Sequence, residues 1–308
     1  MEIKRYTDER MASTLKIQSC VLETVHRVFR EEGFTQIMPV ILSTTTDPLG
    51  PDPSASTIKK GEIEYLGQKL VLTQSMILHK QMALMGKLSK IFAVSPCIRL
   101  ETPDRGATGR HLFEFSQVDF ELGGAVMADV FGLMEEVLCE VLKDVKTKCH
   151  RDLTLLGRSL LVPTIPFKRF TTHELKEKYG DDWEASASKL AKEPFWVLCH
   201  EREFYDREDP KRPGHFLDYD LIYPEGFGEA LSGGEREWEF DRLVKRITGG
   251  GKSTEEYGTY LDLAKKGKLR PSAGGGFGVE RLVRFLTGAK HIKQVQLFPR
   301  VPGEEVHI

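Results

Sequence analysis

The sequence predicts an α+β fold, in which a mainly antiparallel sheet carries helices packed on one face. Residues point alternately inward and outward through Ile91 to Glu101, and again through Leu112 to Leu122, as they do in antiparallel strands. Apolar residues recur at helical spacing from Asp8 to Glu32 and from Val126 to Lys148. These strands and helices together define the predicted fold class.

Shorter patterns supply the remaining elements. A stretch rich in Lys, Glu and Ala, Thr171 to Lys192, is predicted to be a small helical insertion. The full set of predicted strands is Pro39 to Ser43, Gln68 to Thr73, Ile91 to Glu101, Leu112 to Leu122, Phe195 to His200, Asp218 to Tyr223, Glu229 to Gly234 and Ser272 to Gly276.

Length and composition are consistent with one large domain spanning residues 1–308. The chain has 308 residues and is 40% hydrophobic, enough to bury a sizeable core, although about 150 residues per domain would also allow two. Loops rich in Pro and Gly at Asp47 to Pro53, Arg207 to Gly214 and Thr248 to Gly251 are candidate lids. With no apolar run of ~18 residues and no leader at Met1 to Arg10, we expect a cytoplasmic protein without membrane contact.

Charge and cysteine content argue against a nucleic-acid-binding protein, a disulfide-stabilised protein and a zinc protein. The chain has 44 Lys and Arg against 46 Asp and Glu, a net charge of -2, and so lacks the basic excess of a nucleic-acid-binding surface. Its five cysteines are an odd number without CxxC spacing, which predicts reduced thiols and neither a disulfide framework nor a zinc site.

Two distant segments predict an ATP site. Arg99-Leu-Glu101 is followed by Arg110-His111-Leu-Phe-Glu-Phe115, and far downstream Gly274-Gly-Gly-Phe-Gly-Val-Glu-Arg281 combines a glycine run with a third arginine. Arginine suits a phosphate because its planar fork donates two parallel hydrogen bonds, and phenylalanine offers a flat apolar face to a purine. The side chains expected on the inward faces of the two strands are Arg99, Glu101, Phe115, Gln117 and Asp119.

With these motifs the sequence resembles the catalytic core of class II aminoacyl-tRNA synthetases of the aspartyl, asparaginyl and lysyl branch. Gly33 to Val40 is similar to that family's first motif, whose proline, here Pro39, usually marks the dimer interface. The resemblance therefore implies a homodimer that uses ATP and Mg²⁺. Because this branch carries an anticodon-binding barrel ahead of the core, and this chain begins with the core's first helix, we expect an enzyme that does not bind tRNA.

The resemblance also assigns the nucleotide to individual residues. Arg99 would hold the α-phosphate and the substrate carboxylate, Glu101 the adenine amino group and Phe115 the ring face. Arg110, His111 and Arg281 would hold the β- and γ-phosphates. Catalysis by Arg99 and Arg281 would be electrostatic, since an in-line displacement at phosphorus needs mainly positioning and charge stabilisation. The alternative for Arg110 and His111 is a mobile surface loop.

Substrate identity is predicted to depend on Thr73 to Gln81, which is similar to the aspartyl-tRNA synthetase pattern Gln-Ser-Pro-Gln-x-x-Lys-Gln. The resemblance implies that Gln74 helps hold the substrate amino group and that Lys80 meets the aspartate carboxylate. Met76 and Ile77 replace the proline and glutamine of the pattern, which leaves the shape of the loop open. The alternative for Lys80 is a solvated helix residue.

A second cluster, Asp218 to Tyr223 with Gly228 to Glu237, resembles the family's metal-and-substrate strand pair. The resemblance implies that Glu229 and Ser232 bind Mg²⁺, with Asp220 nearby, and that Arg236 faces the substrate carboxylate together with Lys80. Oxygen ligands are what this hard ion prefers. The alternative for Asp220 is an ordinary carboxylate at a strand end.

Two cations for one carboxylate predict selection of aspartate, because asparagine would leave a buried charge unpaired. An aspartate-activating core without a tRNA-reading domain needs another acceptor, and the whole chain resembles the archaeal asparagine synthetases related to asparaginyl-tRNA synthetase. The implied reaction joins aspartate, ATP and ammonia to give asparagine, AMP and pyrophosphate through an aspartyl adenylate. Since asparagine requires activation of the β-carboxylate, we hypothesise that Lys80 and Arg236 hold the α-carboxylate and the β-carboxylate faces the α-phosphorus.

A carboxylate near the reacting carbonyl would help by attracting ammonium and taking its proton. Asp119 is the first candidate, although by resemblance it binds the substrate amino group with Gln117 and Gln74; His215 is a weaker candidate that otherwise covers the site. No glutaminase signature is present, so free ammonia is the expected nitrogen donor. The alternatives are a stand-alone aspartyl transferase acting on tRNA or protein, and a catalytically silent regulatory paralogue.

Overall fold

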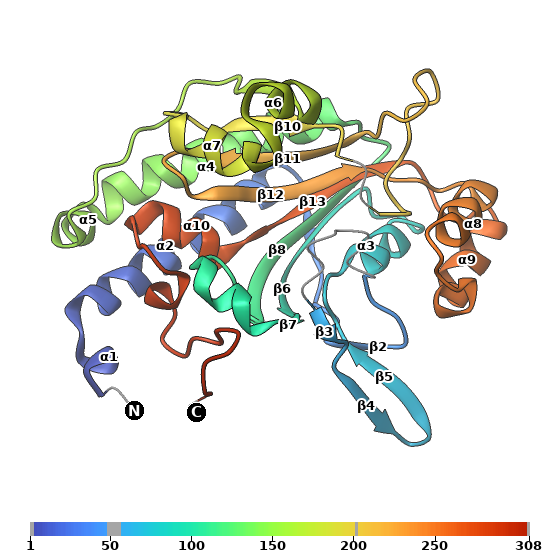
Figure 1. The fold of residues 1–308 in the computed structure, drawn as a ribbon, viewed down its shortest axis with the longest axis horizontal. Coiled ribbons are helices and arrows are strands. Elements are labelled where there is room, and N and C mark those ends of the chain that lie inside the picture. The colour runs from blue at the N-terminus through green and yellow to red at the C-terminus, as the bar shows by residue number, and fades with distance from the viewer. Residues whose placement is uncertain (1–2, 48–56, 201–202, 307–308) are drawn as a thin grey trace.

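The computed structural model describes residues 3–47, 57–200 and 203–306, and an eight-stranded sheet runs through it (Figure 1). Neighbouring strands are antiparallel except in the two outermost pairs, β1 with β6 and β10 with β9. In spatial order the strands are β1 Thr35–Gln36, β6 Lys90–Ile98, β8 Glu114–Gly123, β13 Ser272–Gly278, β12 Gly228–Glu235, β11 Asp218–Tyr223, β10 Phe195–Leu198 and β9 Lys168–Thr171. The predicted α+β class, with a mainly antiparallel sheet flanked by helices, is confirmed.

One face of the sheet carries the main apolar core. Val118, Phe120 and Leu122 of β8 point to this face, where they pack with the helices α2 (Glu9–Glu31), α4 (Met127–Lys148) and α10 (Val279–Thr287). The Asp8 side chain caps α2 by accepting a hydrogen bond from the Arg10 amide at 2.9 Å. Both long helices lie where their apolar periodicity predicts them, because each buries its stripe against the sheet.

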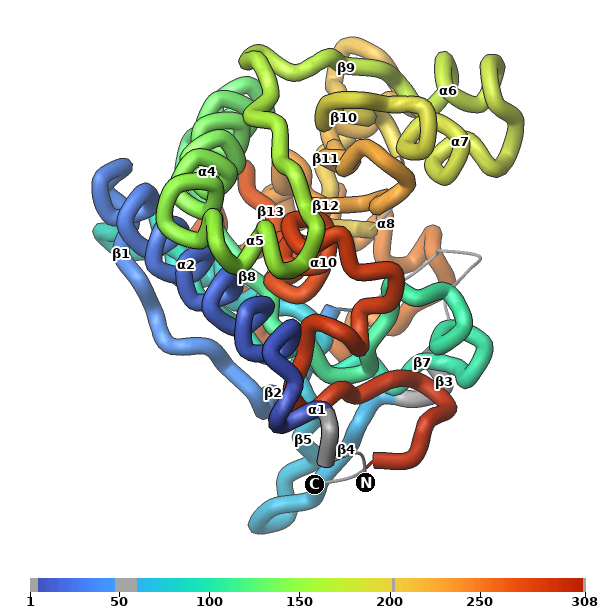
Figure 2. The backbone as a smooth tube through the Cα atoms, turned by 90° about the vertical axis from the view of Figure 1, so that its left-hand side faces the viewer, coloured from blue at the N-terminus to red at the C-terminus, as the bar shows by residue number. Residues whose placement is uncertain are grey.

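The opposite face carries the small and polar residues of the same strands, and helices cover it too. Over this face lie α3 (Ile77–Ala83) and, at the far edge, α6 (Thr172–Tyr179) and α7 (Trp183–Leu190), the latter two packing on Val197 and Ile222. Figure 2 shows α2 and α4 on one side of the strands and α6 and α7 on the other. The expectation of helices on one face was therefore wrong, because the apolar residues of β10 and β11 on the second face are covered by α6 and α7.

Helices α6 and α7 occupy most of the stretch predicted as a helical insertion. They join β9 to β10, which run parallel and therefore need a crossover connection. β9 is not among the predicted strands, so the return of this segment to the sheet differs from the prediction. Two more helices that were not predicted, α8 (Phe240–Gly249) and α9 (Gly258–Lys265), form a separate apolar cluster with Phe204 and Tyr205.

Several predicted strands are shorter or belong elsewhere. Pro39 to Ser43 is reduced to β2 (Leu42–Ser43), which joins β5 (Gln68–Leu72) and β4 (Glu62–Tyr65) in a separate three-stranded sheet. Its hairpin projects from the body in Figure 1, turning at Leu66 and Gly67, both with positive φ. Ile91 to Glu101 breaks at Arg99, beyond which β7 (Leu100–Glu101) leaves the main sheet to pair with β3 (Thr57–Lys59). The predicted lid at Asp47 to Pro53 lies outside the described residues beyond Asp47.

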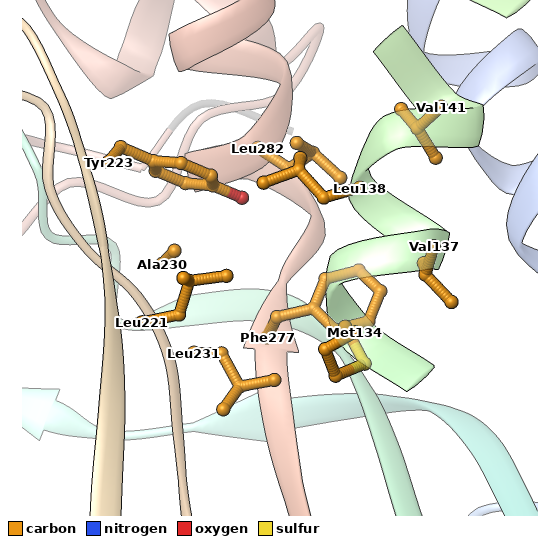
Figure 3. A pocket seen from close by; sticks show the side chains of 10 residues that line it. All are labelled: Met134, Val137, Leu138, Val141, Leu221, Tyr223, Ala230, Leu231, Phe277 and Leu282. Atoms are coloured by element: carbon orange, nitrogen blue, oxygen red, sulfur yellow. The ribbon is translucent and has the colours of Figure 1, made fainter. Parts of the chain in front are cut away.

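The remaining helices are short: α1 spans Ile3–Thr7 and α5 spans His150–Leu156. None of the described helices is both long and apolar enough to cross a bilayer. A cavity on the core side of the sheet is lined by apolar side chains, among them Met134, Leu138 and Phe277 (Figure 3). Its lining includes no charged group.

Candidate active site

The floor of the polar face is built from glycine. Gly274 and Gly276 of β13 lie opposite Glu121 and Asp119 of β8. A Cβ on Gly274 would lie 2.3 Å from both Glu121 Oε2 and the Phe120 carbonyl oxygen, and one on Gly276 would lie 1.8 Å from Gln117 Nε2. The glycine run therefore leaves room for acidic and amide side chains to lie across the neighbouring strand.

Two buried cations meet over this floor. Lys80 of α3 donates from Nζ to Asp119 Oδ1 at 2.9 Å and to the Gly275 carbonyl at 2.8 Å. Arg236, just beyond β12, donates from Nε to Glu121 Oε1 at 3.1 Å and from Nη1 to Asp206 Oδ1 at 3.2 Å. The solvated-helix alternative for Lys80 is thereby excluded, because the ammonium is buried and paired.

From the sequence, Lys80 and Arg236 were expected to be two cations without carboxylate partners, but in the structure buried carboxylates surround them. Glu121 lies between them, since its Oε2 is 3.9 Å from Lys80 Nζ and 3.4 Å from Arg236 Nη2, and Ser272 Oγ donates to its Oε1 at 2.8 Å. Three buried carboxylates, Glu121 included, therefore surround two cations. Glu121 could have been found by extending the alternation two residues beyond Asp119, whereas Asp206 comes from a loop with no recognisable pattern.

Each cation nevertheless keeps a donor. An arginine has five N–H groups and a lysine three. Within the described residues Arg236 uses four, counting both bonds from Nη2 to Glu121 and to the Gly274 carbonyl, and Lys80 uses two. One hydrogen on each side chain therefore has no acceptor among the described residues.

Two residues predicted to bind substrate have buried acceptors without hydrogen-bond partners among the described residues: Gln74 Oε1 and Asp119 Oδ2. Asp119 receives Lys80 and, at 3.4 Å, Gln117 Nε2, both on its other oxygen. Burial raises the pKa of the Asp119 carboxyl, and Lys80 opposes that rise. Unpartnered buried acceptors are costly, and an ammonium group is the ligand that satisfies them best.

The predicted adenine-binding residues come together at the break between β6 and β7. The Arg99 guanidinium lies 5.2 Å from the centre of the Phe115 ring, and its Nε donates to the Gln74 carbonyl at 3.2 Å. Glu101 Oε2 is buried with no hydrogen-bond partner in the described part of the chain, and burial raises the pKa of this carboxyl against the pull of Arg99. A flat ring and an unsatisfied acceptor match the face and the amino group of a purine.

The two arginines predicted to bind the β- and γ-phosphates are each held by a carboxylate. Arg110 Nη1 lies 2.5 Å from Glu184 Oε1 of α7, and Arg281 Nη1, in the first turn of α10, lies 3.2 Å from Glu229 Oε1. Burial together with Arg281 and Arg110 lowers the pKa of His111 to about 3, so its imidazole is neutral at physiological pH. The Arg110 guanidinium is therefore tied to α7 by an ion pair.

Glu280 is a site residue that the sequence analysis missed. Its two carboxylate oxygens both accept the Ser116 amide at 3.0 Å, and Oε1 accepts Gln296 Nε2 at 2.8 Å. The contact ties the start of α10, and with it Arg281, to the strand that carries Phe115. Its position beside Arg281 in the glycine-rich motif was the available signal.

A β-bulge brings the predicted metal ligands to one face. Ser232 pairs with Asp220 and Glu229 with Ile222, so the register skips Ala230. Without the bulge, residues three apart would point to opposite faces. Asp220 also lies 3.4 Å from His200 Nε2. His215, the weaker candidate base, contacts Cys199 Sγ at 3.5 Å instead of the cation cluster.

The chain matches the family model described as tRNA synthetases class II (D, K and N) over residues 2–302. The chain belongs to this family. It is 30% identical to the asparagine–tRNA ligase of Thermococcus gammatolerans, over 96% of this chain and 70% of that protein, and 30% identical to the aspartate–tRNA(Asp/Asn) ligase of Archaeoglobus fulgidus, over 97% and 70%.

Among solved structures, the fold is similar to a class II member, the asparaginyl-tRNA synthetase of Pyrococcus horikoshii complexed with asparaginyl-adenylate. The TM-score is 0.86 at 27% identity, and the match covers 97% of this chain and 70% of that one. The cluster of Lys80, Arg236 and their carboxylates thus lies in a catalytic core of the class II D, K and N synthetases, which are ATP-dependent ligases.

The site can be tested for its fit to the Mg²⁺ expected in a class II core. Mg²⁺ is usually held by one or two carboxylates together with substrate phosphates and water. Glu229, Asp220 and Ser232 supply two carboxylates and a hydroxyl on one face, beside the arginines predicted to bind phosphate. No group of three or more His, Cys, Asp or Glu that could hold a metal ion is found among the described residues.

Proposed function

We propose that the protein activates aspartate with ATP to an aspartyl adenylate and transfers the aspartyl group to ammonia, which gives asparagine, AMP and pyrophosphate. The observation that carries this proposal is the pair of remaining donors, one on Lys80 and one on Arg236, beside the predicted nucleotide site. A carboxylate has two acceptor oxygens and satisfies both donors. An amide offers one acceptor and turns an N–H toward the second donor, which leaves it unsatisfied.

The nucleotide would lie along the polar face. Its adenine would stack on Phe115 and donate from its amino group to Glu101, and Arg99 would hold the α-phosphate. Arg110, His111 and Arg281 would hold the β- and γ-phosphates. Arg99 and Arg281 stabilise the charge that develops as a carboxylate oxygen attacks the α-phosphorus and pyrophosphate leaves.

Glu229, Ser232 and Asp220 would hold Mg²⁺ beside these phosphates. The ion supplies neutralisation of phosphate charge when bound. Glu229 would have to exchange its present contact with Arg281 for that role, which frees the arginine for phosphate at the same time.

Gln74, Gln117 and Asp119 would hold the ammonium groups of the reaction. Asp119 Oδ2 and Gln74 Oε1 are buried and unsatisfied among the described residues, so either the substrate amino group or an incoming ammonium would satisfy them. The raised pKa of Asp119 suits a base that takes a proton from ammonium. Neutral ammonia then attacks the activated carbonyl, and the bond to AMP breaks.

Asparagine formation requires the β-carboxylate to be the activated group. With the α-carboxylate held by Lys80 and Arg236, the β-carboxylate faces the α-phosphorus. Aspartate labelled with ¹⁸O in one carboxylate tests this orientation: label from the β-carboxylate is expected in AMP, and label arriving only from the α-carboxylate would refute it.

The reaction itself is tested by incubating the protein with ATP, Mg²⁺, aspartate and ammonium chloride, and assaying asparagine and AMP. Both products are expected in equal amounts. Formation of AMP only when tRNA replaces ammonium would contradict the choice of ammonia as acceptor.

A second candidate is transfer of the aspartyl group to tRNA. The names of the relatives favour it, since the Thermococcus and Archaeoglobus proteins are tRNA ligases. Charging of tRNA with ¹⁴C-aspartate in the absence of ammonium would support this candidate, and asparagine formation without tRNA would support the first.

The protein is further proposed to act as a homodimer through the segment around Pro39. Met38 is 83% exposed and the neighbouring Ile41 and Leu42 are also exposed, an apolar surface that a second copy would cover. Light scattering should give twice the monomer mass, and Met38→Asp should lower it; a monomeric parent would refute the dimer.

A further inference from the structure

Arg110 is fixed by a carboxylate that lies outside every sequence motif of the site. Its Nη1 contacts Glu184 Oε1 at 2.5 Å, and the same oxygen accepts the Glu229 amide at 3.4 Å. Gly228 lies directly beneath the ion pair, because a Cβ there would be 2.8 Å from Arg110 Nη1 and 3.0 Å from Glu184 Oε1. The helix α7 thus inserts a negative charge between an arginine predicted to bind phosphate and the residue predicted to bind metal.

Helix α7 is firmly attached to the strand pair that carries Glu229. Ser188, one turn after Glu184, is fully buried; its Oγ accepts the Gly228 amide at 3.0 Å and donates to the Tyr223 carbonyl at 2.7 Å. The i, i+4 spacing places Glu184 and Ser188 on the same side of the helix, toward this hairpin. Glu184 is therefore held in position by its own helix, independently of Arg110.

Three arginines, Arg110, Arg281 and Arg284, lie close enough to influence one another electrostatically near Glu184. Burial, followed by the charges of Arg281 and Arg110, lowers the pKa of Arg284, and His111 is neutral. The carboxylates paired with this arginine cluster are Glu184 and Glu229. A polyphosphate that enters must displace a carboxylate before it can use the full charge of Arg110.

We propose that Glu184 is a positioning residue that competes with the nucleotide polyphosphate for Arg110, and so weakens the binding of ATP and pyrophosphate in favour of product release. The inference rests on the proposed role of Arg110 at the β- and γ-phosphates. Helix α7, although it lies at the edge of the sheet, would then control how tightly the polyphosphate binds. AMP has no β- or γ-phosphate, so its binding should not depend on Glu184.

The test is calorimetric binding of ATP, pyrophosphate and AMP to the full chain without aspartate. Glu184→Gln removes the charge but keeps an oxygen for the Glu229 amide. We expect it to tighten the binding of ATP and pyrophosphate by about two- to fivefold, the upper part of the range for a partly exposed ion pair, and to leave the binding of AMP unchanged. Glu184→Asp keeps the charge and should bind like the parent.

Two further variants separate this inference from a general effect of charge. Glu225→Gln breaks the Arg158 pair at 2.6 Å on the same hairpin and should leave all three affinities unchanged. In an Arg110→Met background the effect of Glu184→Gln should vanish, because the two groups act as one pair.

Failure of the parent to bind ATP would refute the proposed nucleotide site itself. If the parent binds ATP and Glu184→Gln binds it equally or more weakly, only the competition is refuted. Weaker binding of the variant that appears only with Mg²⁺ would assign the carboxylate to the metal and overturn the proposal in the same way. Equal tightening of AMP and ATP would show a non-local effect and count against it.

Discussion

Replacing Lys80 by methionine tests the buried charge cluster most sharply. The change keeps the length of the side chain and removes two hydrogen bonds, to Asp119 at 2.9 Å and to the Gly275 carbonyl at 2.8 Å. Glu121 keeps Arg236, so the loss is concentrated on Asp119, whose remaining hydrogen bond is to Gln117 at 3.4 Å. Removing one partner of a buried ion pair typically costs about 3–5 kcal/mol, and we expect the lower end here.

The loss of unfolding free energy in Lys80→Met should be larger at high pH than at low pH. Burial holds the pKa of Asp119 above its unfolded value, so the native state binds the extra proton and its stability falls as pH rises through the folded pKa. Lys80 opposes this rise, and its removal raises the pKa further. The free energy of unfolding of Lys80→Met should therefore lie closer to that of the parent at about pH 5 than at about pH 8.

Urea denaturation at the two pH values measures both effects. Lys90→Met is a matched control at the surface, because it removes a contact of 3.7 Å to the Glu32 carboxylate and a hydrogen bond of 2.8 Å to the Glu32 carbonyl, and should cost about 1 kcal/mol. Aspartate binding should be lost in Lys80→Met at either pH. Equal stability of the two variants, or a deficit that grows on acidification, would refute the account of a buried, paired ammonium.

Three other changes test separate parts of the site. Gly274→Ala would place a Cβ 2.3 Å from the Phe120 carbonyl oxygen and should lower the free energy of unfolding, measured in urea, by about 1–3 kcal/mol or more. The control Gly132→Ala, in an open position of α4, should raise the free energy of unfolding by about 0.5–1 kcal/mol. The reverse order of stability would contradict the glycine floor. Glu101→Gln turns an N–H toward the adenine amino group and should raise the KM for ATP about tenfold while improving use of GTP, and an unchanged ATP-to-GTP preference would exclude Glu101 from purine recognition. Because burial, Arg281 and Arg110 hold the pKa of His111 at about 3, its imidazole should stay neutral when ATP binds at about pH 7; calorimetry of ATP binding in two buffers should show the same proton balance for the parent and for His111→Asn, and proton uptake that disappears in the variant would rule this out.

Much of the site was predictable because strand periodicity places it. Phe115, Gln117 and Asp119 share the polar face as their spacing of two requires, and Arg99 joins them at the end of the adjacent strand. The glycine run was recognised as a motif, but its physical reason, the room it leaves for Glu121 and Gln117, appears only from the pairing of β13 with β8.

The remaining features depend on long-range packing that no local pattern records. Asp206 reaches Arg236 from a loop, and Glu184 reaches Arg110 from a helix 74 residues further along the chain. The bulge at Ala230 changes which residues of β12 share a face, which strict alternation would have predicted wrongly. The neutralisation of Lys80 and Arg236 was not predicted for the same reason. Both cations belong to recognisable motifs, whereas two of the carboxylates around them, Glu121 and Asp206, do not.

Amino-acid-dependent exchange of labelled pyrophosphate into ATP tests the claim that the paired Lys80 and Arg236 donors select a dicarboxylic amino acid for activation. Aspartate should support exchange and asparagine should not, whichever carboxylate of aspartate the two cations hold, because asparagine presents an amide either to the donors or to the α-phosphorus. The Lys80→Met, Arg236→Met double variant should lose the exchange with aspartate. Exchange driven equally well by asparagine, or retained in the double variant, would contradict the account.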